Sequence, residues 1–148
     1  MKRKIFIGAD SAGYTLKEDL KNHLIQNGYE VTDMGTDSQE SCHYPLFADA
    51  VCAAVQNDLS GSYGVLVCGT GIGMSMCANK HKSIRAALCS DTFSAKMTRR
   101  HNDANVLCIG ARVVGSYLAI DILDTFLENE FEGGRHQIRV EMMMELEK

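Results

Sequence analysis

The run Cys68-Gly69-Thr70-Gly71-Ile72-Gly73 places a nucleophilic thiol directly before a glycine-rich turn. The apolar residues 64–68 precede this turn and a helical pattern follows it, so the turn joins a predicted strand to a predicted helix. Glycines let backbone N–H groups approach a ligand, and the N-terminal end of a helix attracts negative charge. The pattern therefore predicts an anion or oxyanion site, beside which Cys68 is favoured as a reactive thiolate. The alternative is a buried core cysteine, which is how we interpret Cys52, Cys77, Cys89 and Cys108.

A dinucleotide-binding loop is the alternative interpretation of the same turn. That fingerprint requires G-x-G-x-x-G after the first strand, whereas the spacing here is G-x-G-x-G after the third predicted strand. Asp91, which lies 22 residues after Gly69, keeps this alternative open.

Two arginines, Arg135 and Arg139, are four residues apart in the last predicted helix. Like charges at this spacing repel each other, and cations in a first helical turn oppose the helix dipole. A phosphate held between the two guanidinium groups would compensate for both effects. The alternative is a solvated basic face that is paired to Glu132 or Glu141. His101, at the end of another predicted helix, could be a partner of the helix dipole or an exposed acid–base group.

Short apolar runs alternate with helical patterns along the chain. The apolar runs predict strands at 4–8, 29–33, 64–68, 85–89 and 105–110. The intervening helices include one with Leu16, Leu20 and Leu24 on one face, closed by Gly28, and the last has a stripe of Ile138, Met142 and Leu146. This alternation predicts an α/β fold with a doubly wound, five-stranded parallel sheet, in a single domain over residues 1–148.

The predicted sheet also predicts where a ligand binds. In such sheets ligands bind beyond the carboxyl ends of the strands, which is where Asp10, Cys68, Asp91 and Arg112 fall. His43 and Tyr44 lie in a polar loop that could line the same site.

Composition excludes several other classes of protein. The 148 residues include 15 Lys+Arg and 19 Asp+Glu, and the formal charge of −4 argues against nucleic acid or an anionic membrane as partner. No apolar run approaches the roughly 18 residues of a membrane span, and the apolar segment near the start is too short for a signal peptide. Six cysteines without a C-x-x-C pair predict reduced thiols in a cytoplasmic protein. The five histidines show no zinc-binding spacing, so we expect no metal.

A further set of motifs covers nearly the whole chain. It comprises Gly8-Ala9-Asp10 with Gly13 and Leu16-Lys17, Tyr44-Pro45, and the segments 68–73, 78–80, 84–86, 100–105, 110–115 and 131–141. In this order the motifs resemble the ribose-5-phosphate isomerase type B family, which also contains galactose-6-phosphate and allose-6-phosphate isomerases.

The resemblance implies a Rossmann-like, cofactor-free aldose–ketose isomerase that interconverts ribose 5-phosphate and ribulose 5-phosphate through an enediolate. It implies a homodimer, or a dimer of dimers, with sites shared between subunits, and the Gly133-Gly134 break suggests that the C-terminal helix reaches the partner. Cys68 matches the base that moves a proton between C1 and C2, with Thr70 beside it, and His101 of the partner matches the group that assists ring opening. The implied substrate contacts are Asp10, Ser11, Tyr44, Gly69, Gly71, Ile72, Gly73, Asn102, Arg112, Arg135 and Arg139.

One departure from the family pattern affects the expected substrate. Pentose isomerases of the family usually read Asp-His-x-Gly, whereas this chain reads Asp10-Ser11-Ala12-Gly13. Serine is smaller than histidine and carries no charge, so a hexose 6-phosphate remains an alternative substrate. A nonenzymatic module that binds a sugar phosphate or a nucleotide is a third hypothesis, and the intact Cys68 and His101 disfavour it.

Overall fold

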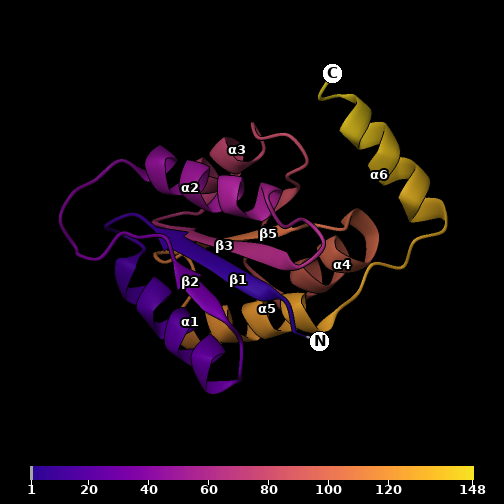
Figure 1. Cartoon of the computed structure of the whole chain (residues 1–148). Coiled ribbons are helices and arrows are strands. Elements are labelled where there is room, and N and C mark those ends of the chain that lie inside the picture. The colour runs from indigo at the N-terminus through magenta and orange to yellow at the C-terminus, as the bar shows by residue number, and fades with distance from the viewer. Residues whose placement is uncertain (1) are drawn as a thin grey trace.

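The computed structural model describes residues 2–148 and contains a five-stranded sheet with helices on both faces (Figure 1). The strands are β1 (Lys4–Ala9), β2 (Val31–Asp33), β3 (Ser62–Cys68), β4 (Ala86–Leu88) and β5 (Val106–Gly110). They pair in parallel in the order β2-β1-β3-β5-β4. The prediction of a doubly wound α/β fold with five parallel strands is confirmed.

Six helices connect or follow the strands. They are α1 (Tyr14–Gln26), α2 (Tyr44–Gln56), α3 (Ile72–Ala78), α4 (Thr92–Asn102), α5 (Ser116–Glu128) and α6 (Arg135–Glu145). The sequence placed Tyr44 in a loop, but it is the first residue of α2. The helix begins there because Pro45 favours the first turn of a helix. None of the helices in residues 2–148 is long and apolar enough to cross a membrane.

The central strand β3 shows how the two layers of the core form. All seven of its residues are buried, and successive side chains point to opposite faces of the sheet. Val65 and Val67 join the apolar cluster formed with α1, α4 and α5, whereas Leu66 and Cys68 join the cluster formed with α2 and α3. The alternation places the Cys68 thiol on the α2–α3 face, at the end of the strand.

Helix α6 differs from the other helices because it lies beside α4 and away from the sheet (Figure 1). Its buried residues are His136 and Val140. The predicted apolar stripe is exposed: the exposed fractions are 60% for Ile138, 66% for Met142 and 84% for Leu146. This stripe therefore does not contribute to the core of its own chain.

Candidate active site

The loop that follows β1 is packed against the end of β3. The Asp10 N–H donates to the Val67 carbonyl oxygen (3.2 Å), and an Asp10 carboxylate oxygen accepts from the Gly13 N–H (3.0 Å). A Cβ atom at Gly13 would lie 2.3 Å from the Val67 carbonyl oxygen, so only glycine allows this close approach. The packing fixes Asp10 beside the strand that ends at Cys68.

The loop after β3 folds around the Cys68 sulfur. The thiol is almost fully buried, and its Sγ accepts a hydrogen bond from the Gly71 N–H at 3.1 Å. Gly71 has a φ of +77°, which favours glycine, and the Ile72 N–H donates to Thr70 Oγ1 at 3.2 Å. The Gly71 N–H therefore points directly at the sulfur, from within the glycine-rich loop.

Two more elements complete this group of residues. The Arg112 N–H donates to the Gly69 carbonyl oxygen at 2.9 Å, and a Cβ atom at Gly69 would lie 3.7 Å from both Arg112 Nη1 and Ala12 Cβ. The loops after β1, β3 and β5 therefore converge at Gly69. The Tyr44 ring covers Gly73, since a Cβ atom there would lie 2.5 Å from the ring. We call this set the carboxyl-edge group: Asp10, Ser11, Tyr44, residues 68–73 and Arg112.

The remaining predicted residues lie at the opposite edge of the sheet. Helix α4 starts after β4 and returns the chain to the start of β5, so His101 and Asn102 lie near the amino ends of the strands. Eleven helical residues span about 16 Å. Helix α6, with Arg135 and Arg139, lies on this same side of the molecule, where Figure 1 also shows the start of β1. We call His101, Asn102, Arg135 and Arg139 the amino-edge group. One chain therefore holds the predicted residues as two separate groups.

The His101 side chain belongs to a cluster with two residues that the sequence did not single out. Its ring stacks on that of His136 with centroids 4.0 Å apart and planes 9° apart. Glu132 Oε1 lies 3.4 Å from His101 Nε2 and 3.8 Å from His136 Nε2. The other Glu132 oxygen, Oε2, accepts from Arg100 Nε at 3.0 Å. Glu132 lies in the linker before α6, four residues ahead of His136, and this spacing was the available signal in the sequence.

These three side chains could in principle hold a metal, because their ligand atoms lie within 4.8 Å of one another. An imidazole binds a metal through a lone pair in the plane of its ring, at about 2.0–2.1 Å for zinc. Two nearly parallel rings cannot both direct their lone pairs at one ion unless one of them rotates. The arrangement fits stacking and ion pairing better than metal binding.

Charge in this cluster is strongly biased towards cations. Burial, together with the neighbouring charges of His101 and Arg135, lowers the pKa of His136. The Glu132 carboxylate contacts Arg100 and both histidines, and the Glu141 carboxylate accepts a hydrogen bond from Gln137 at 3.0 Å.

Arg135 and Arg139 are therefore left without a carboxylate. Both side chains are exposed, and neither forms an ion pair within residues 2–148. The expected pairing of this basic face with Glu132 or Glu141 is not found within residues 2–148, and the two exposed guanidinium groups are open to an anionic ligand.

Asp91 and the other cysteines have structural roles. Asp91 caps α4 by accepting from the Ser94 N–H at 2.6 Å, which is a common role for aspartate before a helix and removes the reason to assign it to a ribose. Burial raises the pKa of Cys52 to about 12 and that of Cys89 to about 11, and it raises the pKa of Cys108 as well. All six cysteines are free.

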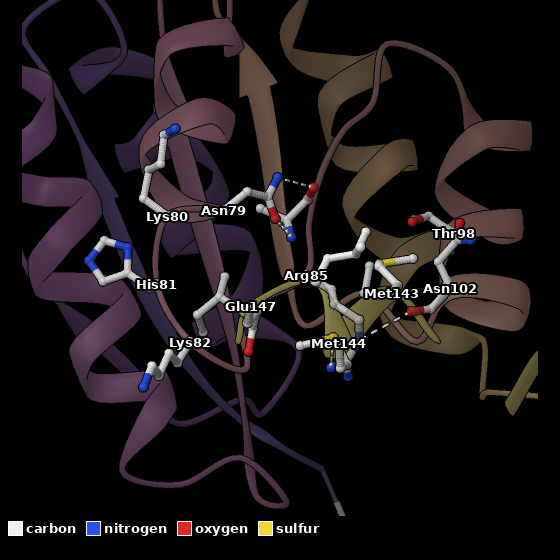
Figure 2. Close-up of a pocket in the computed structure, with 14 residues that line it drawn as sticks. Asn79, Lys80, His81, Lys82, Arg85, Thr98, Asn102, Met143, Met144 and Glu147 are labelled. Carbon is white, nitrogen blue, oxygen red and sulfur yellow. Dashed lines mark hydrogen bonds between the residues drawn. The ribbon is translucent and has the colours of Figure 1, made fainter. Parts of the chain in front are cut away.

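A cavity of about 640 Å³ borders the amino-edge group (Figure 2). It lies between the last turns of α6 and the segment from the end of α3 to β4, and Asn102 is part of its wall. Arg85 lies in the wall and donates from Nε to the carbonyl oxygens of Asn102 (3.2 Å) and Asp103 (3.0 Å), so it holds the C-terminal end of α4. No local sequence pattern reveals this role of Arg85, because its partners lie on a different element.

Fold and site together define a doubly wound α/β protein in which a thiol and a glycine loop lie at the carboxyl edge of the sheet. The family model described as Ribose/Galactose Isomerase matches residues 5–143, and the chain belongs to this family.

Individual relatives agree with this assignment along the whole chain. The chain is 47% identical over 147 residues to "Ribose-5-phosphate isomerase B" of Escherichia coli, covering 99% of this chain and 97% of the relative. It is 43% identical over 145 residues to "Ribose-5-P isomerase B" of Listeria innocua, covering 98% and 97%.

Solved structures are equally similar. Ribose-5-phosphate isomerase B of Clostridium thermocellum superposes with a TM-score of 0.95 at 49% identity, covering 97% of both chains. Ribose-5-phosphate isomerase B of Mycoplasma genitalium, solved with bound ribulose-5-phosphate, gives a TM-score of 0.96 at 40% identity, covering 99% of this chain and 97% of that one. The resemblance found in the motifs is confirmed, and the protein is a sugar-phosphate isomerase by family.

Proposed function

We propose that this protein interconverts ribose 5-phosphate and ribulose 5-phosphate, with Cys68 as the base. The observation that carries the proposal is the Gly71 N–H donating to Cys68 Sγ at 3.1 Å, at the mouth of a glycine loop. Relatives that are 40–49% identical bear the name of this isomerase, and one of them was solved with the ketose product bound. No cofactor enters the proposed reaction.

In this mechanism the thiolate removes the proton from C2 of the open-chain aldose, and negative charge develops on the C1 oxygen. A proton then passes from the C2 hydroxyl to the C1 oxygen, and the protonated thiol returns the carbon-bound proton to C1 to give the ketose. A positioned base contributes on the order of 10²–10⁴-fold, and each N–H aimed at the developing oxyanion contributes about 3–4 kcal/mol. In this proposal the N–H groups of residues 69–73 bind the developing oxyanion, and Thr70 Oγ1 lies beside it. Asp10, Ser11 and Tyr44 contact the sugar hydroxyls.

The site in this proposal is shared between two subunits of a homodimer. His101 and Asn102 of one subunit, with Arg135 and Arg139, complete the carboxyl-edge group of the other, the arginines and Arg112 binding the phosphate. The separation of the two groups within one chain supports this arrangement. So do the two unpaired guanidinium groups and the exposed apolar stripe of α6, which offers surface to a partner.

Replacement of Cys68 tests the assignment of the base. We expect Cys68→Ala to lower kcat for ribose 5-phosphate by at least about 10²-fold, because it removes a general base. Cys77→Ala is the matched control, since Cys77 is a half-buried thiol on α3 outside the loop. Near-normal turnover by folded Cys68→Ala protein would refute the role of the thiol.

A hexose 6-phosphate is a second candidate substrate, and Ser11 is the observation that favours it. Ser11 follows Asp10 in the loop that converges on Gly69, and its small side chain leaves space there for a longer sugar. Turnover of ribose 5-phosphate, allose 6-phosphate and galactose 6-phosphate, each with and without a chelator, distinguishes the two candidates.

A further inference from the structure

The His101 ring is held by groups from two other parts of the chain, the linker after α5 and helix α6. We infer that Glu132 and His136 are positioning residues that hold His101 for opening of the cyclic sugar. The inference rests on the proposed function, together with the role in ring opening that the family resemblance implies for His101.

Arg100 holds Glu132 in place through two hydrogen bonds. The Glu132 N–H donates to the Arg100 carbonyl oxygen at 3.0 Å, and Glu132 Oε2 accepts from the Arg100 guanidinium at 3.0 Å. Backbone and side chain of one α4 residue thus orient the carboxylate, which leaves Oε1 facing both imidazole Nε2 atoms at 3.4 and 3.8 Å. A carboxylate in this position restrains the direction of the His101 ring through its contact with Nε2.

His136 supplies the second restraint, a flat surface. It is 8% exposed and its plane lies 9° from that of His101, so rotation of the His101 ring would break the stack. The charged groups that face the pair are Glu132 from the linker, Arg100 from α4, and Arg135 and Arg139 from α6. Burial and the cations of α6 lower the pKa of His136, which favours its neutral form.

Ring opening needs this kind of restraint. As the bond between C1 and the ring oxygen breaks, the C1 hydroxyl loses its proton and the ring oxygen gains one. A single imidazole that accepts the first proton and donates the second balances the step without a co-reactant. Both transfers require the ring to keep its orientation, and a displacement of about 1 Å can cost up to about 10²-fold in rate.

A pair of substrates separates ring opening from the later proton transfer. Ribose 5-phosphate is mainly cyclic. In 4-deoxyribose 5-phosphate the ring-forming hydroxyl is absent and the 5-oxygen carries the phosphate, so this aldose cannot form the five-membered ring. We expect His136→Ala and Glu132→Gln to lower kcat/KM for ribose 5-phosphate by about 10- to 10²-fold, and for the 4-deoxy compound by less than about 3-fold.

Further variants separate positioning from folding. His136→Phe keeps a flat ring against His101, so we expect it to recover most of the activity that His136→Ala loses. Gln137→Ala is the matched control on the same helix, because the Gln137 side chain donates its hydrogen bond to Glu141, outside the cluster. Thermal unfolding of each variant shows that the fold is retained.

His101→Ala distinguishes failure of the inference from failure of the proposed function. If His101→Ala impairs turnover of both substrates equally, His101 does not act in ring opening, and the positioning role falls with it, whereas the role of Cys68 is tested separately by Cys68→Ala. If His101→Ala impairs only ribose 5-phosphate turnover, while His136→Ala and Glu132→Gln impair neither or both substrates, the positioning role alone is refuted. Should His136→Ala not fold, Glu132→Gln and His136→Phe give the decision.

Discussion

Mixing two inactive variants, Cys68→Ala and Arg135→Ala, tests whether one site combines residues of two subunits. Cys68 lies at the carboxyl edge of the sheet and Arg135 at the amino edge, so we expect them to meet only across a subunit interface. In a heterodimer one site then carries both substitutions and the other site carries neither. Activity therefore returns in mixtures of two proteins that are each inactive alone.

The size of the recovery follows from the symmetry of a dimer. Random exchange of equal amounts makes about half of the dimers mixed, and each mixed dimer has one intact site of two. We expect about one quarter of the wild-type activity per total protein. If both residues belonged to one subunit, every site in the mixture would carry one substitution, and no activity would return.

The assay follows ribulose 5-phosphate formation after the variants are mixed under conditions that allow subunit exchange, which mass spectrometry of tagged chains confirms. Cys68→Ala mixed with Arg112→Ala is the matched control, because the Arg112 N–H bonds to Gly69 in the same carboxyl-edge group. This control mixture should stay inactive. Absence of recovery with Arg135→Ala, after confirmed exchange, would refute the shared site.

Three further predictions concern specificity and stability. We expect Ser11→His to raise the ratio of kcat/KM for ribose 5-phosphate over allose 6-phosphate by about 10-fold, because a charge-assisted hydrogen bond contributes about 1.5–3 kcal/mol; an unchanged ratio would mean that position 11 does not set specificity. Burial favours neutral His81, but its hydrogen bond to Asp49 (2.7 Å) outweighs this and raises the pKa of His81. Asp49→Asn should therefore lower the free energy of unfolding below about pH 6, and the difference should vanish as the pH rises through that pKa; a difference independent of pH would contradict this. Lys17→Ala should lower the free energy of unfolding in urea by about 3–5 kcal/mol, because the fully buried Lys17 ammonium pairs with Asp33 at 2.8 Å, and a loss below about 1 kcal/mol would count against a structural role for the pair.

The fold could be predicted because local patterns and the global sheet agree. Strands β1, β3 and β5 are apolar runs buried on both sides, and parallel strands of this kind are readily recognised. The predicted bounds were least accurate for the edge strands β2 and β4, which have three residues each where the sequence predicted five. Short edge strands carry few apolar side chains, so their ends leave little trace in the sequence.

The site was predicted unevenly for a related reason. Cys68 and its glycine loop are contiguous, so a local motif shows both the thiol and the N–H groups around it. The His101 cluster joins three elements of the chain, and no local pattern reveals that Glu132 faces two histidines. The apolar stripe of α6 was predicted with the correct helical period. Periodicity, however, does not say which molecule covers an apolar face, so the sequence could not show that this face is exposed on its own chain.

Placing the two groups of residues at opposite edges of one sheet has a consequence for the effect of dilution. A single chain in the proposed arrangement contains two half-sites that cannot meet, so catalysis depends on association. Turnover per mole of enzyme should fall when the protein is diluted below the dissociation constant of its dimer, and it should recover with a lag after concentration. A ligand that weakens the interface would therefore inhibit the enzyme without ever occupying the sugar pocket.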